Sequence, residues 1–440
     1  MRKPAWNWVS AAIFLALCLL ALVKVVYQDV PRIKQTVLTH NDMQPLYLSS
    51  RVWLAGGNPY DPATLTEEMR KSVPAGLQLL NGHCEDDCQI YYPPTAMPIF
   101  ALTSFLPWKA YFAVFLFLIV AVYLFCLYTL AQTLESPSLK LLFWGVGLVF
   151  SPFHAGIGTM NVSVLLVPVI FLCVLRKQGT AAAVLMGIVA CIKPPLALLF
   201  IGYYVLSGQR KKAFASIGVI AIIVAISILR LRGTGWLPSY ELALSHFSAT
   251  TDGPGGVAQH GVANIGFLNL QAIFYILLHS ARTAVALDDL VLLGLYVALI
   301  VPLFGRSGRL YASENHLAIM AALCSLTLFL PSLQYYNGLL LLAPALYSLR
   351  LRPDAARIFI GIACASFALP PRWFTVFNSL KRHAIGTTLS AANAKQLVPR
   401  VQLSFGQELA ACLPSLLATA ISVVLVLILL RWRADSTTTA

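Results

Sequence analysis

The chain has 440 residues, of which 58% are hydrophobic and 11% charged, and its formal net charge is +14. Ordinary soluble domains carry about 25% charged residues. Apolar runs recur along the whole length, which excludes a soluble fold and predicts a polytopic helical membrane protein. The basic residues form short clusters between these runs, as the positive-inside rule expects of cytoplasmic ends. They form no stripe interleaved with aromatic residues, so we expect no nucleic-acid partner.

The first predicted span covers residues 8–26, with the N-terminus inside. This run is long, and the segment that begins at Lys24 offers no small-residue cleavage site, so we interpret it as a retained span rather than a signal peptide. A long external segment, 27–107, follows and contains eight of the 17 acidic residues. Within it, residues 93–107 are too short to span and are predicted to form a juxtamembrane helix against protein or a water-filled cavity.

Eleven further spans are predicted after this segment, which gives about twelve in total with both termini inside. Their ranges are 108–131, 141–157, 162–175, 180–192, 194–207, 213–229, 285–304, 315–331, 338–349, 357–370 and 410–430. Further external loops cover residues 230–264 and 371–409, and the sequence leaves open whether residues 265–281 cross the membrane. The predicted fold class is therefore all-α, with one membrane domain over residues 1–440.

Asp42 is the candidate catalytic residue. It lies in the polar segment 40–44, within about 15–20 residues of the end of the first span. A carboxylate at the membrane surface can take the proton of a hydroxyl group during group transfer, whereas the simplest alternative is a solvated loop acid. An amphipathic aromatic stretch over 46–54 follows, and Gly56-Gly57-Asn58-Pro59-Tyr60 comes next. That order predicts a helix, a C-terminal stop and a turn.

Lys193 is a lone cation between two apolar halves, directly before two prolines. A charge near membrane depth is costly and often functional, and a lysine suits a phosphate as a point charge. Reaching out to the interface is an equally good explanation. Asn161 and Asn264 are amides that can join helices or bind sugar hydroxyls, and the first role is favoured for each taken alone.

In this topology the short breaks at 158–161, 193–195 and 332–337 fall on the same outer face as Asp42. Short spans interrupted by Pro or Gly tend to line binding sites in membrane proteins. Further polar side chains expected on that face, as loop residues or phosphate-binding groups, are His40, His154, His246, His260, Arg372 and Arg382.

Cys84 and Cys88 flank three acidic residues in the first external segment. A disulfide is favoured if this loop is outside the cytoplasm; free thiols, or a metal site with His83, are the alternatives. The sequence contains no Walker loop and no G-x-G-x-x-G, H-E-x-x-H or G-x-S-x-G motif. Nucleotide-driven transport by this chain is therefore excluded, and no cofactor is expected.

In order along the first 270 residues, these stretches resemble the polyprenyl-phosphate-sugar-dependent GT-C glycosyltransferases of family 87. The matching elements are Asp42 with the Gly-x-x-Pro-Tyr ending at Tyr60, Tyr92-Pro93-Pro94 through Pro107, Gly158-Thr159-Met160-Asn161 with Thr in place of the family's Gln, Lys193-Pro194, and Asn264. The family's late Ser-Pro-x-Ser-Trp-x-His-His stretch is replaced here by 332–337, which has no histidine.

The resemblance implies a GT-C fold and an inverting hexosyltransferase that needs no nucleotide, with Asp42 as the general base. It implies a polyprenyl-phosphate donor, most simply of mannose, and a lipid-linked or cell-envelope glycan acceptor at the periplasmic face of a bacterial inner membrane. The substrate-binding residues expected are His40, Asn41, Tyr60, Asn161, Lys193, Asn264, Gln334, Tyr335 and Asn337. The alternative is a lipid-linked glycan flippase without catalysis, which would tolerate Asp42→Asn.

Overall fold

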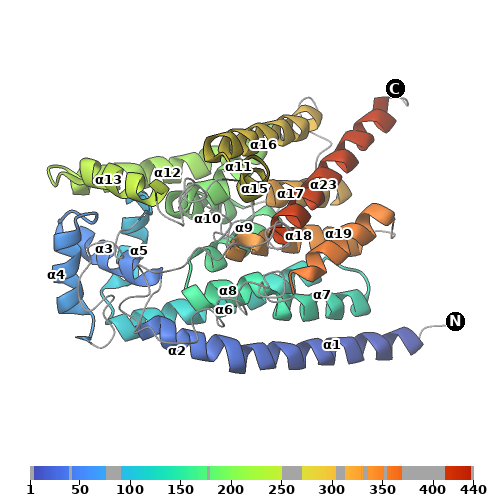
Figure 1. The fold of residues 1–440 in the computed structure, drawn as a ribbon, viewed down its shortest axis with the longest axis horizontal. Coiled ribbons are helices and arrows are strands. Elements are labelled where there is room, and N and C mark those ends of the chain that lie inside the picture. Colours follow the sequence, from blue (N-terminus) through green and yellow to red (C-terminus); the bar gives the residue numbers. More distant parts are fainter. Residues whose placement is uncertain are drawn as a thin grey trace.

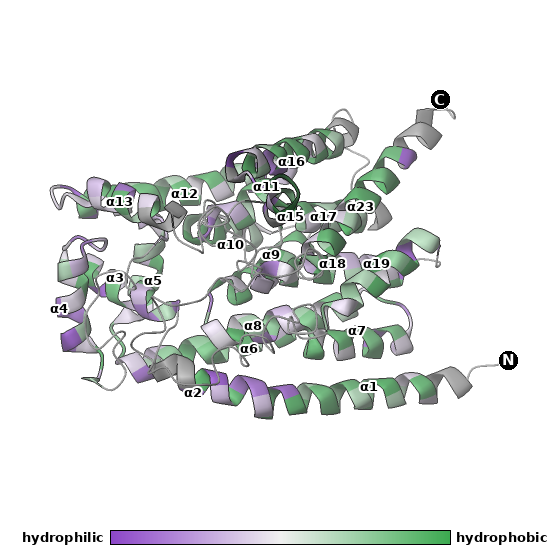
Figure 2. Cartoon of the chain, viewed as in Figure 1, coloured by the Kyte–Doolittle hydropathy of each residue, from purple (hydrophilic) through white to green (hydrophobic). Residues whose placement is uncertain are grey.

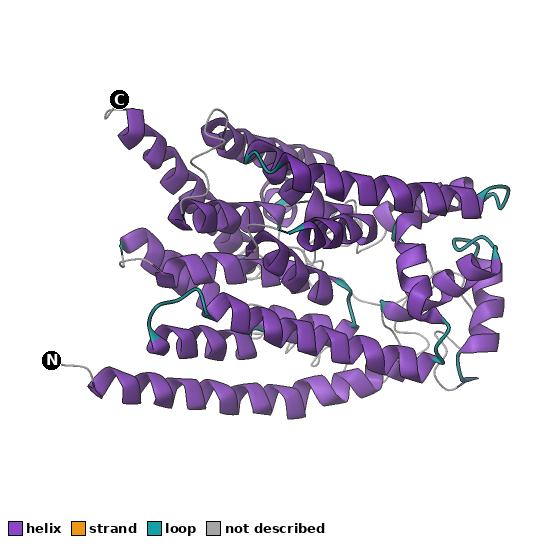
Figure 3. Ribbon diagram, turned by 180° about the vertical axis from the view of Figure 1, so that it is seen from behind, coloured by secondary structure: helices purple, strands orange, loops and turns teal. Residues whose placement is uncertain are grey.

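The computed structural model describes residues 4–38, 42–75, 91–175, 179–249, 270–303, 313–328, 330, 335–350, 354–368 and 412–437. Within these ranges every regular element is a helix, and loops or turns join the helices, as Figure 3 shows from behind. The predicted all-α class is therefore confirmed.

Six helices in the described part are long and apolar enough to cross a membrane, since a span needs about 20 residues. They cover Trp8–Lys34, Trp108–Ala131, Pro137–Thr159, Arg210–Leu231, Arg282–Ile300 and Leu413–Arg431. Shorter apolar helices cover Ser163–Leu175, Thr180–Ile192, Pro194–Leu206, His316–Thr327 and Ala355–Ser366. Several long apolar helices make this a multi-pass membrane protein, but the expected count of about twelve full spans is not confirmed.

Two predicted spans differ from the structure, and the segment that the sequence left open is partly described. The first span is longer than 8–26, because α1 (Pro4–Lys24) continues through a π turn, η1 (Val25–Asp29), into α2 (Val30–Leu38). The predicted span 338–349 begins instead as a 3₁₀ segment, η6 (Tyr335–Leu341), followed by α18 (Leu342–Arg350). The described part of the open segment 265–281 contains α15 (Gln271–Leu278), whose eight residues extend only about 12 Å and cannot cross a bilayer.

The long helices form a bundle with a cap of short helices at one end (Figure 1). The bundle includes α6 (Trp108–Ala131), α7 (Pro137–Val149), α12 (Arg210–Leu231), α16 (Ala281–Leu303) and α23 (Leu413–Thr437). The cap contains α3 (Met43–Ala55), α4 (Pro62–Ser72), α5 (Met97–Ser104) and α13 (Trp236–Ala249). Both chain termini lie at the opposite end of the bundle.

Hydropathy follows this division (Figure 2). The long helices are predominantly apolar along their length, and hydrophilic residues are prominent on α4. Exposed apolar side chains such as Leu19 and Leu22 on α1 are expected where helices face lipid rather than water.

Glycine lets two pairs of helices approach closely. A Cβ atom at Gly145 of α7 would lie 2.6 Å from Leu17 Cδ1 of α1. A Cβ atom at Gly187 of α10 (Thr180–Ile192) would lie 2.7 Å from the backbone oxygen of Ser216 on α12. The Ser216 hydroxyl donates to the Ala183 carbonyl at 2.8 Å. Small residues and short polar side chains of this kind hold membrane helices together.

The predicted helix, stop and turn after Asp42 are confirmed. Helix α3 ends at Gly56, whose φ of +82° suits glycine. Asp61 then caps α4 by accepting from the Thr64 N–H at 3.0 Å. Arg230 of α12 donates to the carbonyl oxygens of Trp53 and Leu54. The C-terminal end of α3 is therefore fastened to the bundle.

Replacing Gly187 by alanine is expected to lower the free energy of unfolding by about 1–3 kcal/mol, because the added methyl group presses on backbone that cannot move away cheaply. The matched control is Gly218→Ala, two residues from the Ser216 contact, where a Cβ atom meets nothing within 4 Å. Thermal unfolding of the two purified variants in detergent checks this. Equal midpoints for both variants and the wild type would contradict the close α10–α12 packing.

Candidate active site

The break between α8 (Ser151–Thr159) and α9 (Ser163–Leu175) is held by the side chain of Asn161. Met160 takes the left-handed conformation there, with a φ of +52°. The Asn161 Oδ1 atom accepts from the Ser163 N–H at 2.9 Å, as a capping side chain does at the start of a helix. Its Nδ2 atom donates to Asp42 Oδ2 at 2.5 Å. Asn161 is buried, and both ends of its amide are used.

Asp42 is fixed by the same break through its backbone and its side chain. Its N–H donates to the Thr159 carbonyl oxygen at 3.1 Å, and its carboxylate accepts from Asn161. The residue is partly buried directly before α3. The Asn161 amide and the Thr159 carbonyl thus hold Asp42 against the break between α8 and α9.

Lys193 lies in the break between α10 and α11 (Pro194–Leu206), outside any helix, and reaches the same group of residues. Its Nζ atom donates to Ser163 Oγ at 2.8 Å and lies 5.4 Å from the ring centroid of Tyr336. Burial lowers the pKa of Lys193 to about 8, and the negative charge of Asp42 opposes that shift. A cation and a carboxylate thus act on each other across this site.

Tyr92 is a further member of the site. Burial raises the pKa of the Tyr92 phenol well above its usual value, and the charge of Asp42 adds to that shift. The Tyr92 carbonyl accepts from the Tyr60 hydroxyl at 3.0 Å. Thr95, three residues on, donates to the Cys191 carbonyl oxygen at 2.6 Å. The segment after Tyr92 is thereby joined to the end of α10, two residues before Lys193.

The arrangement is a chain of contacts in the order Asp42, Asn161, Ser163, Lys193 and Tyr336. It places a proton acceptor and a cation at breaks between apolar helices. A carboxylate can take a proton from a hydroxyl nucleophile, and an ammonium group can stabilise an anionic leaving group. These are the two requirements for single-step transfer of a group from an anionic carrier to an alcohol.

The family model of Glycosyltransferase family 87 matches residues 91–333. This is more than half of the chain. The chain belongs to glycosyltransferase family 87. It is therefore a transferase enzyme of the membrane. No curated protein and no solved structure matches the chain significantly.

The matched region of this family 87 enzyme includes Tyr92, Asn161 and Lys193, whereas Asp42 precedes it. The hydrogen bond between Asp42 and Asn161 is one of several that connect the N-terminal segment to the matched region. Three residues singled out separately in the sequence, Asp42, Asn161 and Lys193, lie in one cluster.

Three other predicted binding residues, Tyr60, Tyr335 and Asn337, are buried in the enzyme. Tyr60 is buried, packs on Tyr240 with ring centroids 4.8 Å apart and holds Tyr92 through its hydroxyl. Tyr335 is buried against Phe367, with ring centroids 6.0 Å apart, and Asn337 is fully buried in η6. The predicted residues that lie outside the described ranges are His40, Asn41, Cys84, Cys88, His260, Asn264, Gln334, Arg372 and Arg382.

Sequence reasoning missed Tyr336 and Arg32. Tyr336, rather than Tyr335, faces Lys193, because neighbouring residues of the 3₁₀ segment η6 lie on different faces. Arg32 of α2 packs along α8, since a Cβ atom at Gly158 would lie 3.2 Å from Arg32 Cδ. The glycine of the Gly158-Thr159-Met160-Asn161 motif is therefore the signal that another element lies against it.

The expectation for His154 was wrong. It was placed among loop residues or phosphate-binding groups, but it is buried inside α8, where Asp29 and Leu148 bind its ring nitrogens. As for metals, no group of three His, Cys, Asp or Glu side chains in the described part of the chain is placed to hold an ion. The suggested metal site with His83 lies outside that part.

Proposed function

We propose that this family 87 enzyme transfers a hexose, most simply mannose, from a polyprenyl-phosphate carrier to a lipid-linked or cell-envelope glycan. The observation that carries the proposal is the contact chain from the Asp42 carboxylate through Asn161 and Ser163 to the Lys193 ammonium group. A base and an anion-binding cation at helix breaks suit a sugar donor whose leaving group is a phosphate. Membership in a glycosyltransferase family supports catalysis over passive flipping.

In the proposed reaction an acceptor hydroxyl attacks the anomeric carbon of the donor sugar. The Asp42 carboxylate accepts the hydroxyl proton as the new bond forms. The bond between the anomeric carbon and the phosphate oxygen breaks, and the phosphate leaves with the electron pair. Lys193 stabilises the charge on this leaving group. A single displacement inverts the configuration at the anomeric carbon.

Asn161 orients the base in this mechanism. Its amide donates to one carboxylate oxygen, Asp42 Oδ2, so the carboxylate cannot rotate freely. The Tyr92 phenol stays protonated because burial raises its pKa, and it can therefore donate a hydrogen bond to sugar or phosphate. His40, Asn41, Asn264 and Gln334 stay proposed contacts for donor and acceptor.

We infer that the domain has a GT-C fold in a bacterial inner membrane, with the cap of short helices and the site on the periplasmic side. Both termini lie at the far end of the bundle from that cap (Figure 1), which fits termini in the cytoplasm. The basic pair Arg2-Lys3 and the late Arg431 and Arg433 support that orientation by the positive-inside rule.

Asp42→Asn is expected to lower kcat by about 10²–10⁴-fold, because it removes the general base while keeping the shape of the side chain. Donor binding should change little. The assay is transfer of sugar by purified protein from synthetic polyprenyl-phosphate mannose to a panel of envelope glycolipids. Glu67→Gln, which alters an exposed acid of α4, is the control and should keep wild-type transfer.

Three results would contradict parts of the proposal separately. Transfer by Asp42→Asn at the wild-type rate would remove Asp42 as the base but leave the enzyme. If the wild type transferred sugar from no polyprenyl-phosphate donor, the donor class would be wrong. A wild type and Asp42→Asn that both flipped lipid-linked glycan across vesicles equally well would favour transport.

The pKa of Lys193 predicts how activity depends on pH. Its pKa of about 8 means that the ammonium group is charged below pH 8 and neutral above it. We expect kcat/KM for the donor, which reports the free enzyme, to fall as the pH rises through about 8. In Lys193→Arg the side chain stays charged, so this fall should disappear even if the absolute rate is lower. An unchanged alkaline fall in Lys193→Arg would contradict phosphate binding by Lys193.

A further inference from the structure

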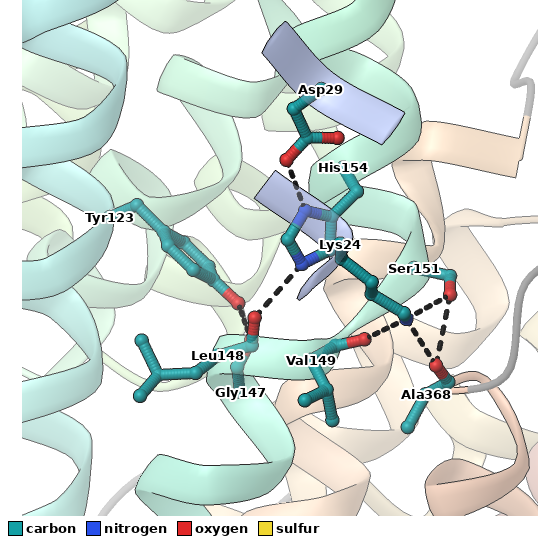
Figure 4. A network of polar contacts seen from close by, with 9 residues as sticks. All are labelled: Lys24, Asp29, Tyr123, Gly147, Leu148, Val149, Ser151, His154 and Ala368. Carbon is teal, nitrogen blue, oxygen red and sulfur yellow. Dashed lines mark hydrogen bonds and ion pairs between the residues drawn. The ribbon is translucent and has the colours of Figure 1, made fainter. Parts of the chain in front are cut away.

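A second polar cluster lies inside the bundle, away from the active site (Figure 4). Asp29 and His154 are both buried, at 3% and 2% exposure, and Asp29 Oδ2 lies 2.5 Å from His154 Nδ1. The Lys24 ammonium group next to them bonds the Val149 and Ala368 carbonyl oxygens and the Ser151 hydroxyl. Ionisable groups at membrane depth are costly, and in membrane proteins they usually mark a function.

The hydrogen bonds show that the pair shares a proton. The other ring nitrogen of His154, Nε2, lies 2.9 Å from the Leu148 carbonyl oxygen. A carbonyl oxygen only accepts hydrogen bonds, so Nε2 carries a hydrogen. The contact between Nδ1 and the Asp29 carboxyl group is then either an imidazolium with a carboxylate or a neutral ring with a carboxylic acid. Both forms bind the two side chains firmly in an apolar setting.

The π turn η1 (Val25–Asp29) carries Asp29 into this contact. A π turn takes in one residue more than an α turn. Because each residue turns an α-helix by about 100°, the extra residue changes the face on which the next side chains lie. Asp29 is the buried residue of η1. Its Oδ1 atom has no hydrogen-bond partner in the described part of the chain, so His154 supplies the hydrogen bond that compensates for burying the carboxyl group.

The helices that meet at this pair lead directly to the active site. Helix α2, which follows Asp29, packs along α8, which carries His154. Arg32 of α2 lies against Gly158 of α8. Asp42 follows α2 in the chain, and its N–H bonds the Thr159 carbonyl at the end of α8. Asn161 lies seven residues beyond His154, about 10 Å along a helix.

We propose that the Asp29–His154 pair is a positioning pair, which sets the register of α2 against α8 and thereby places the Asp42 carboxylate against the Asn161 amide. The proposal deepens, and rests on, the proposed role of Asp42 as the base. The pair is itself remote from the transferred sugar and acts through Asp42 and Asn161. Misplacing a catalytic group by about 1 Å can cost about 10²-fold in rate, so a fixed register has a kinetic consequence.

The first test compares Asp29→Ala, His154→Ala and Asp29→Asn by kcat and donor KM. The two alanine variants should lower kcat at least tenfold and leave donor KM within about threefold. Asp29→Asn should recover kcat to within about threefold, because its amide N–H can donate to Nδ1 of the neutral ring that already donates from Nε2. Alanine variants with wild-type kcat, or an Asp29→Asn variant as slow as Asp29→Ala, would overturn the proposal.

A buried histidine elsewhere provides the matched control. His316 is buried, lies 2.8 Å from the Tyr203 hydroxyl through Nδ1 and 3.1 Å from the Val174 carbonyl oxygen through Nε2. It lies on α17 (Ser313–Thr327), and this helix carries neither Asp42 nor Asn161. His316→Ala should lower thermal stability as His154→Ala does, and the folded protein should keep kcat within about twofold. An equal loss of kcat in both variants would point to stability alone.

The second test asks whether the pair acts through Asn161. In an Asn161→Ala background, Asp29→Ala should cause little further loss of kcat, since the amide that it positions is gone. Effects on independent sites combine additively in free energy, so their fold-losses multiply. A double variant slower than Asn161→Ala by the full factor of Asp29→Ala would overturn the proposal.

The third test needs no substrate. Amide hydrogen exchange should be faster in Asp29→Ala than in the wild type over 156–164 and at Asp42, whose N–H bonds Thr159. Exchange over α12 should be unchanged. Unchanged protection over 156–164 would overturn the positioning pair whatever the enzyme transfers. If the wild type failed to transfer sugar while this exchange result held, the proposed function alone would be wrong.

Discussion

Polar groups in an apolar bundle must find hydrogen-bond partners, and this constraint explains the positions of the functional side chains. The break between α7 and α8 leaves the carbonyl oxygens at the end of α7 without their helical hydrogen bonds. Three successive carbonyl oxygens at the end of α7, those of Gly147, Leu148 and Val149, receive donors from Tyr123, His154 and Lys24 (Figure 4). Irregular backbone at membrane depth is tolerated only where such partners exist.

The same constraint shapes the active site at the other end of α8. The Thr159 carbonyl accepts from the Asp42 N–H, and the Ser163 N–H donates to Asn161. The two breaks that flank α8 therefore bind polar residues from distant parts of the chain, Lys24 at one and Asp42 at the other. Asp42 and, at the next break, Lys193 bond to residues beside the α8–α9 break in this way, and the proposed mechanism uses them as base and anion-binding group.

The sequence pointed to residues of this site but not to the contacts between them. Asp42, Asn161 and Lys193 were identifiable because each polar residue lies at an interruption of the apolar sequence. Tyr336 could not be distinguished from Tyr335, since the 3₁₀ geometry that separates them depends on packing against Gly156. The Asp29–His154 pair was also missed, because a π turn changes the helical phase and leaves no clear mark in the sequence. Hydropathy gave the helical class but did not settle the number of spans, because short apolar helices and full spans have similar composition.

The most direct test of this account is a structure of the Asp42→Asn enzyme with polyprenyl-phosphate mannose bound. The account predicts the donor phosphate within about 4 Å of Lys193 Nζ, as in an ion pair. It also predicts room for an acceptor hydroxyl about 3–3.5 Å from the anomeric carbon, between that carbon and residue 42. A donor bound with its phosphate remote from Lys193, or with its sugar turned away from residue 42, would contradict the assignment of this site.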